Sequence, residues 1–261
     1  MNCSNTAGRV KMKARNINLA LFSAFLLCLI SLPILCVDKY LSHQDYPWQL
    51  TPFGYDSLSQ HYKDHYLTMD AKALVTHLKD STKPVVTVMI DGWGVPYDES
   101  TLEEDFALLK KEKVKFAMHR RLLGYTSHAE NVEYRSGLAG GTFLTQGDSL
   151  ICAQRADSTY WKFGQALCCE NCDDSKMISV IDSLLSDSTQ TRLGWTARST
   201  REGDREKLHN ILQGLSDIAS RHPDVQFIIQ GTHRPILGTP ETRRKYLAPW
   251  VPAVFINCEL K

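Results

Sequence analysis

Three chemically capable side chains follow short apolar runs or turns of this sequence. Asp91 comes directly after the apolar run 85–90 and precedes Gly92, which lets a chain turn sharply. Thr126 lies in the segment GYTSHAE, and His233 lies in GTHRP, just beyond another apolar run. A hydroxyl on a turn that opens a helix can be activated as a nucleophile by a metal ion or by the helix N-terminus. A hydroxyl, a carboxylate and an imidazole together could also hold one divalent cation.

Each of these residues also has a purely structural interpretation. Asp91 could cap the turn that follows it, and a single histidine such as His233 is more often a surface or hydrogen-bonded residue than a ligand. Ser136 is a second candidate nucleophile, but the residues just before it are typical of a helix interior. Thr126 is therefore the leading candidate, and the shared position of the three residues favours the joint interpretation.

The apolar runs predict the elements that would position these residues. The run 85–90 is rich in β-branched residues and indicates a strand buried on both faces, as in parallel sheets. In such sheets ligands bind beyond the carboxyl ends of the strands. A capping box, Ser100 with Glu103, predicts the start of a helix, and 70–78 also looks helical. We expect strands at 85–90, 114–118, 192–196, 225–229 and 251–256, and helices at 100–111, 175–185 and 204–220.

This alternation predicts an α/β fold, a mostly parallel sheet with helices on both faces. The chain has 261 residues, of which 43% are hydrophobic and 23% charged, which suits one domain with a full core. The formal net charge is +1, so no global basic field indicates nucleic acid as a partner.

An apolar run at 19–37 predicts a transmembrane anchor. About 20 apolar residues cross a bilayer core, and no charge interrupts the run before Asp38. Basic residues at 9–15 place the N-terminus in the cytoplasm by the positive-inside rule. A cleaved signal peptide is the alternative. The expected parts are a cytoplasmic N-terminus at 1–18, the anchor at 19–37, a juxtamembrane linker with helical character at 38–80, and an extracytoplasmic domain at 81–261.

A cysteine cluster, CCENC, lies in the predicted exported part. Disulfides persist outside the cytoplasm, so we expect two of Cys168, Cys169 and Cys172 to take part in disulfides, with Cys152 as another partner. A zinc half-site is the alternative, but no second Cys/His pair stands at finger-like spacing. The exported part has an odd number of cysteines once Cys258 is included, so at least one thiol is left over.

The order of three motifs resembles the alkaline phosphatase superfamily. VVTVMIDGWGVP matches a first strand that ends on an acidic residue, GYTSHAENVEYRSGLAGG a nucleophile loop, and FIIQGTHRP a late strand followed by a histidine motif. Within the superfamily the chain is most similar to the membrane-anchored, sulfatase-like branch that includes lipoteichoic acid synthases and phosphoethanolamine transferases. The resemblance covers roughly 85–257.

The resemblance implies a metal-dependent enzyme of the cytoplasmic or inner membrane. Asp91, Thr126 and His233 would hold Mn, Mg or Zn, with Thr232 at the remaining ligand position. Thr126 would attack a phosphate ester to form a phospho-enzyme. The implied substrate is a phosphate-containing lipid headgroup or glycan.

Two departures from the family pattern favour an alternative function. Thr232 stands where relatives carry Asp, and a hydroxyl binds a hard divalent cation less tightly than a carboxylate. The substrate-side histidine expected after the strand 192–196 is absent, since the sequence reads TARSTREGD. Asp204 or His209 could substitute as ligands. The alternative is a catalytically inactive relative that acts as an envelope binding or interaction protein.

Overall fold

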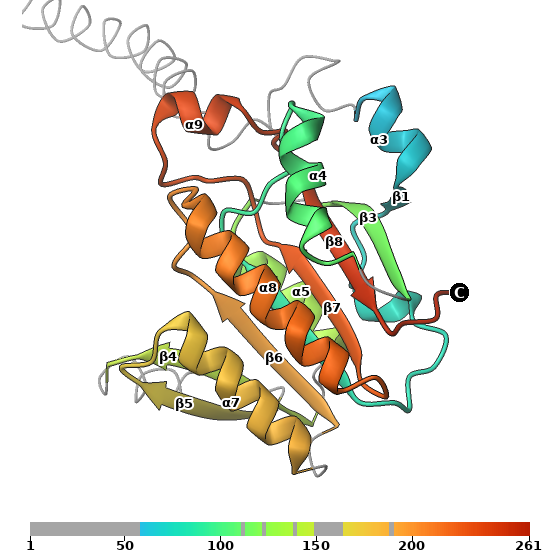
Figure 1. The fold of residues 1–261 in the computed structure, drawn as a ribbon, viewed down its shortest axis with the longest axis vertical. Helices are drawn as coiled ribbons and strands as arrows, with labels where there is room; N and C mark the ends of the chain where they lie inside the picture. Colours follow the sequence, from blue (N-terminus) through green and yellow to red (C-terminus); the bar gives the residue numbers. More distant parts are fainter. Residues whose placement is uncertain (1–57, 111–112, 122–123, 138–139, 149–163, 188–190) are drawn as a thin grey trace, which may run out of the picture. The chain divides into compact units, whose positions relative to one another are not determined.

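A computed structural model describes residues 58–261, except 111–112, 122–123, 138–139, 149–163 and 188–190 (Figure 1). The chain divides into two units, 1–46 and 47–261, and all described residues belong to the second. The predicted anchor at 19–37 lies outside the described residues. Among those described, no helix has the length and apolar character needed to cross a membrane.

The described strands form one eight-stranded mixed sheet, with β8 antiparallel to its neighbours β3 and β7 and every other adjacent pair parallel. Its order is β1-β3-β8-β7-β2-β6-β4-β5. The strands are β1 (Leu67–Met69), β2 (Val85–Ile90), β3 (Val114–Arg120), β4 (Gly141–Gly147), β5 (Gly164–Glu170), β6 (Arg192–Ala197), β7 (Gln226–Gly231) and β8 (Trp250–Ile256).

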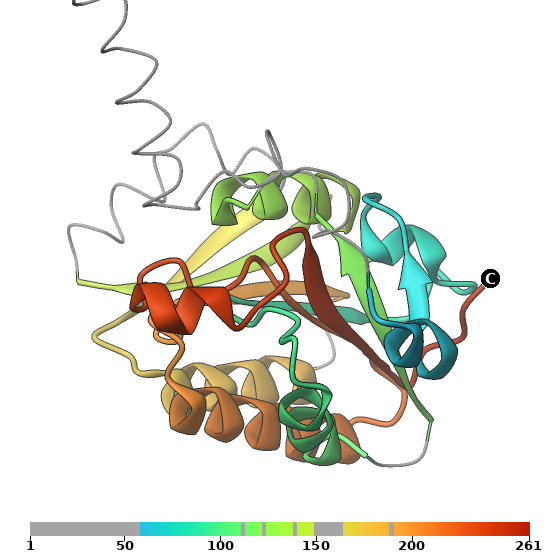
Figure 2. The same ribbon diagram turned by 90° about the horizontal axis from the view of Figure 1, so that it is seen from above.

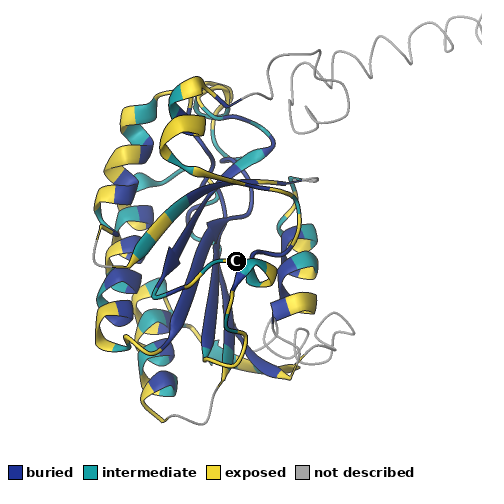
Figure 3. Cartoon of the chain, turned by 90° about the vertical axis from the view of Figure 1, so that its right-hand side faces the viewer, coloured by how far each residue is buried: buried dark blue, intermediate teal, exposed yellow. Residues whose placement is uncertain are grey.

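The central strand β2 is buried along its whole length, as its unbroken apolar run predicts. It pairs in parallel with β6 on one side and β7 on the other, so these three strands end at one edge of the sheet. Figure 3 shows the buried strands between helices that turn their exposed faces outward. The core of the domain is thus the sheet and the apolar helix faces against it.

Helices cover both faces of the sheet, as predicted (Figure 2). α4 (Glu99–Ala107), α7 (Asp174–Ser186) and α8 (Arg205–Arg221) pack on one face. α5 (Thr126–Gly137) and the 3-10 helix η1 (Leu74–His77) pack on the other. The short helices α3 (Gln60–His65) and α9 (Pro240–Arg244) complete the described elements. α8 buries the stripe that its periodicity predicted: Leu208, Ile211, Leu212, Leu215 and Ile218.

Several predicted boundaries were wrong. The helix expected at 100–111 begins at Glu99, and the Asp98 carboxylate caps it by accepting from the Ser100 backbone N–H. Within 70–78 only the short η1 forms. β1 lies inside the predicted linker 38–80 yet pairs with β3 at the edge of the sheet. This part of the linker therefore belongs to the folded domain.

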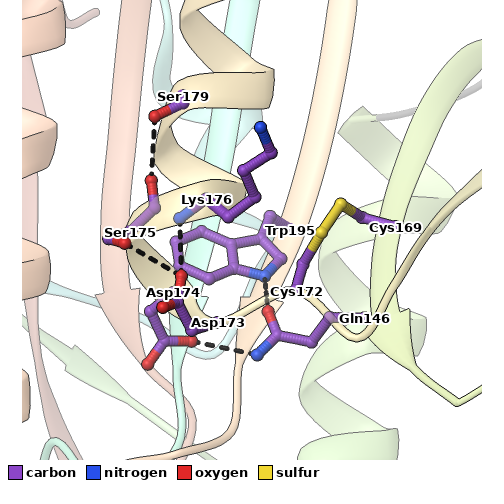
Figure 4. The surroundings of a disulfide bond; sticks show 9 residues. All are labelled: Gln146, Cys169, Cys172, Asp173, Asp174, Ser175, Lys176, Ser179 and Trp195. Atoms are coloured by element: carbon purple, nitrogen blue, oxygen red, sulfur yellow. Dashed lines mark hydrogen bonds between the residues drawn. A yellow bond between two sulfur atoms is a disulfide. The ribbon is translucent and has the colours of Figure 1, made fainter.

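A disulfide joins Cys169 at the end of β5 to Cys172, just before α7 (Figure 4). Cys168 is also disulfide-bonded, so the predicted involvement of this cluster in disulfides is confirmed. Asp173, next to Cys172, caps α7 by accepting from the Lys176 backbone N–H at 2.8 Å. The disulfide thus fixes the start of α7 against the sheet. Cys258 is free and buried, and burial raises the pKa of its thiol to about 12.

Candidate active site

The loops that follow β2, β6 and β7 meet at one edge of the sheet. Two glycines allow this close approach. A Cβ added at Gly231 would lie 1.8 Å from the Trp93 carbonyl oxygen, and one at Gly92 would lie 2.4 Å from that of Thr200. Gly92 also has φ +79°, a conformation that other residues adopt only with strain. The tight backbone packing brings side chains from three strand ends together.

Asp91 is the centre of this cluster and is completely buried. Its Oδ1 accepts hydrogen bonds from Thr126 Oγ1 at 2.8 Å and from Thr232 Oγ1 at 2.7 Å. Its Oδ2 accepts from Arg201 Nε at 2.7 Å. The Thr200 hydroxyl bonds the Asp91 backbone carbonyl. Four side chains therefore hold Asp91, and its carboxylate bonds Thr126, Thr232 and Arg201 from three different segments of the chain.

Thr126 is the first residue of α5 and bridges Asp91 and His233. Its Oγ1 lies 3.1 Å from His233 Nε2, and that nitrogen lies 3.8 Å from Asp91 Oδ1. Because α5 begins at Thr126, the hydroxyl also lies at the positive end of a helix dipole. The hydroxyl is thus placed between a carboxylate and an imidazole, the arrangement that activates nucleophiles.

A backbone carbonyl fixes the proton on one nitrogen of the His233 ring. Its Nδ1 lies 2.7 Å from the Arg234 carbonyl oxygen, which can only accept, so Nδ1 carries the proton. Its Nε2 faces the Thr126 hydroxyl, whose own proton is donated to Asp91 Oδ1. Burial lowers the pKa of His233, Asp91 opposes this, and the charges of Arg201 and Arg121 lower it further.

A buried ionic network supports the site from the α5 side. Arg121 follows β3, and its Nη1 donates to Glu133 Oε1 on α5 at 3.1 Å. Arg121 Nη2 donates to Gln230 Oε1 on β7 at 2.5 Å and lies 3.4 Å from the Gly231 carbonyl oxygen. Arg121 thus connects the helix that carries Thr126 with the strand that leads to His233.

The Arg121–Glu133 pair is buried, and so is His119 beside it. Burial raises the pKa of the Glu133 carboxyl, against the opposing effect of Arg121. His119 on β3 is fully buried with its Nε2 3.8 Å from Glu133 Oε1. Burial, then Arg121 and His77, lower the pKa of His119 well below its usual value.

A second carboxylate lies one turn along α5 from Thr126. Glu130 accepts from Arg198 Nη2 at 3.0 Å, and burial raises the pKa of Glu130. Arg198 and Arg201 both lie in the loop after β6. The two carboxylates flanking Thr126, Asp91 and Glu130, are therefore each paired with an arginine of one loop.

The structure brings together all four residues named from the sequence as site residues: Asp91, Thr126, Thr232 and His233. The suggested substitutes lie elsewhere, since Asp204 caps α8 and His209 Nε2 contacts Asp105 at 3.0 Å. Ser136 is exposed on α5. Sequence analysis missed Arg201, Thr200 and Arg121. A signal for the first two was their place in TARSTREGD, directly after a strand that neighbours β2.

The four predicted ligands do not fit a divalent cation in this arrangement. Asp91 is the only carboxylate among them, and both of its oxygens are already bonded, one of them to a guanidinium. Thr126 and Thr232 contribute neutral hydroxyls, which are weaker ligands for hard cations. In the described part of the chain, no three His, Cys, Asp or Glu side chains form a group suited to a metal ion. A cation would have to displace Arg201 from Asp91.

No protein-family model and no curated protein matches this chain. The solved structures that are similar to it include the following three. An alkaline phosphatase superfamily protein from Vibrio parahaemolyticus has TM-score 0.44 and 12% identity, over 69% of this chain and 61% of that chain. The lipoteichoic acid synthase LtaP from Listeria monocytogenes has TM-score 0.41 and 8% identity, over 67% of this chain and 65% of that chain. The C-terminal periplasmic domain of EcEptC from Escherichia coli has TM-score 0.40 and 10% identity, over 68% and 74%.

This chain therefore spans less than two thirds of the first two of these chains. At these identities and TM-scores, the likeness carries no conclusion about activity, substrate or site. One of these neighbours is an alkaline phosphatase superfamily protein and another is a lipoteichoic acid synthase, the two groups that the motifs of this sequence resemble.

Proposed function

We propose that this chain is an enzyme of the cell envelope that transfers or hydrolyses a phosphate-containing group, with Thr126 as its nucleophile. The observation that carries the proposal is the position of Thr126 Oγ1, 2.8 Å from Asp91 Oδ1 and 3.1 Å from His233 Nε2. A structural threonine at a helix start needs neither partner. The envelope location rests on the predicted anchor at 19–37.

The first chemical step uses His233 with a proton on Nδ1 and none on Nε2. The Thr126 hydroxyl turns its proton from Asp91 Oδ1 to Nε2 and gives it up there, while Oγ1 attacks the phosphorus atom. An O–P bond to Thr126 forms, the bond to the leaving oxygen breaks, and the proton on His233 then passes to that oxygen. Asp91, 3.8 Å away, stabilises the imidazolium in between. Water or an acceptor hydroxyl then takes the group from Thr126.

The charges near Thr126 favour an anionic substrate. Arg201 lies beside the nucleophile with a side chain 34% exposed, and the dipole of α5 adds a partial positive charge. Guanidinium groups and helix N-termini stabilise the charge that develops on phosphoryl oxygens. From the motif resemblance, we take the substrate to be a phosphate-containing lipid headgroup or glycan.

The test uses 4-nitrophenyl phosphate and bis(4-nitrophenyl) phosphate as probes. We expect Thr126→Ala to lower turnover by about a thousandfold or more, since loss of a nucleophile removes the whole covalent route. Thr126→Ser keeps a hydroxyl and should retain part of the activity. Ser136→Ala is the matched control, a hydroxyl exposed on the same helix, and should leave turnover unchanged. Activity that survives Thr126→Ala but is lost in Ser136→Ala would contradict the proposal.

A catalytically inactive binding protein is the second candidate. The observation that favours it is that the charge of Asp91 is already neutralised by Arg201, while Thr232 offers only a hydroxyl. This candidate predicts that the unmodified protein turns over neither probe. It also predicts that the Thr232→Asp substitution alone does not create turnover. The active-enzyme proposal predicts measurable turnover without any substitution.

A further inference from the structure

Arg201 is the cationic group that directly contacts the Asp91 carboxylate. Its Nε donates to Asp91 Oδ2 at 2.7 Å, on a residue that is completely buried. A buried carboxylate needs a compensating charge, because transferring it from water alone is very costly. Either a metal ion or a cationic side chain can supply such a charge. Here a side chain of the loop after β6 supplies it instead.

The remaining charges around Thr126 leave little negative potential for a further cation. Glu130, the second carboxylate on this side, is paired with Arg198 at 3.0 Å. Arg121 is a third positive charge near the site, and it is buried and paired with Glu133. A divalent ion next to Asp91 would therefore face Arg201 at close range without a second free carboxylate.

We propose that Arg201 takes the place of a divalent metal ion at Asp91, so that the site binds a phosphate-type oxyanion without metal. The inference rests on the proposed function for the identity of the anion, but its claim concerns what the site binds. A guanidinium that holds Asp91 through Nε still presents its other nitrogens to a ligand. In the part of the chain that the structure describes, these two nitrogens make no hydrogen bond.

The geometry of Arg201 suits this role. Its side chain is 34% exposed whereas that of Asp91 is fully buried, so the guanidinium connects the buried carboxylate with solvent. Guanidinium binds phosphate oxygens in a forked arrangement, and its charge persists at all physiological pH values. Arg201 would thus orient a tetrahedral anion beside Thr126 while it keeps Asp91 in place.

Metal titration of purified protein tests the proposal without any need for activity. Binding of Mn²⁺ and Zn²⁺ is measured by calorimetry for the unmodified protein, Arg201→Ala and Arg201→Gln. We expect the unmodified protein to show no saturable binding that depends on Asp91. Both variants remove the guanidinium charge from Asp91 Oδ2, and we expect at least one of them to bind about one ion at least tenfold more tightly than the unmodified protein does. Arg201→Gln keeps an amide donor for Asp91 and serves if Arg201→Ala does not fold.

Two further variants make the result specific. Arg198→Ala removes an arginine of the same loop, similarly exposed at 31% and also paired with a carboxylate, but leaves Asp91 bonded. It should gain no metal binding. Asp91→Asn combined with the Arg201 variant should abolish the gained binding. Tight, Asp91-dependent binding of one ion by the unmodified protein would overturn the proposal, and so would the absence of any gain in both folded Arg201 variants.

Anion binding provides the second measurement. Inorganic phosphate and orthovanadate are titrated in the presence of EDTA. We expect binding to the unmodified protein that weakens at least tenfold in Arg201→Gln and is not strengthened by Mn²⁺. Binding seen only with added metal would contradict the inference. Metal-free anion binding with no turnover would leave the inference intact and refute the proposed catalytic function, so the two failures are distinguishable.

Discussion

Removal of Arg121 should destabilise the protein strongly, because its partner would remain buried as an unpaired charge. The side chains of Arg121 and Glu133 are only 3% and 1% exposed, and Arg121 Nη1 lies 3.1 Å from Glu133 Oε1. The perturbation is Arg121→Met, which has a similar length and no charge. It also removes the bond to Gln230 on β7.

The free energy of unfolding should fall by about 3–5 kcal/mol, the usual cost of removing one partner of a buried ion pair. The loss should be smaller at acidic pH than at pH 7.5. Burial already raises the pKa of Glu133, and without Arg121 the carboxyl would take up a proton more readily, which removes the unpaired charge.

Urea unfolding followed by circular dichroism measures this change. Arg221→Met is the matched control, because Arg221 pairs with Asp182 at 2.9 Å on the surface, with side chains 55% and 31% exposed. The control should cost less than about 1 kcal/mol. The double variant Arg121→Met/Glu133→Gln should recover a large part of the loss. A cost below about 1 kcal/mol for Arg121→Met at pH 7.5 would refute the assignment of a buried, charged pair.

Three further outcomes follow from the described structure. His119 has a lowered pKa in the folded state, so below about pH 6.5 the unfolded chain binds a proton there that the folded chain does not. The free energy of unfolding therefore loses about 1.4 kcal/mol per pH unit through His119 as the pH falls. His119→Gln should remove this contribution, measured by unfolding curves between pH 6.5 and 5. Replacing Cys169 and Cys172 by Ser should cost roughly 2 kcal/mol by the chain-entropy relation for a short loop, measured by thermal unfolding against the unmodified protein with its disulfides intact. Gly92→Ala should lower the free energy of unfolding by about 1–3 kcal/mol or more and weaken anion binding, because the alanine Cβ would lie 2.4 Å from the Thr200 carbonyl oxygen. An unchanged melting temperature would contradict this.

The central sheet and its main helices were predictable from local patterns. β2 is a continuous apolar run and α8 has a strong amphipathic stripe, so burial of each follows from its own residues. The placement of Asp91, Thr126 and His233 was also predictable, because the carboxyl ends of parallel strands meet at one edge. These inferences needed only short-range patterns and one general rule about sheets.

The partners of these residues were not predictable in the same way. Arg201 bonds Asp91 across 110 positions of sequence, and a lone arginine in a polar loop gives no sign of its partner. Arg121 is one of two adjacent arginines, and the sequence alone gives no sign that its charge is buried against Glu133. β5 was missed because its residues are largely exposed and lack a clear alternation, since it lies at the edge of the sheet.

The most direct test of the central claim is to trap the covalent intermediate. Purified protein is mixed with 4-nitrophenyl phosphate, quenched in acid within one turnover, digested and mapped by mass spectrometry. The account predicts a phosphoryl group on Thr126, in the peptide that begins α5, and its absence in Thr126→Ala. An adduct on Ser136 or another residue, or turnover with no adduct and undiminished activity in Thr126→Ala, would contradict it.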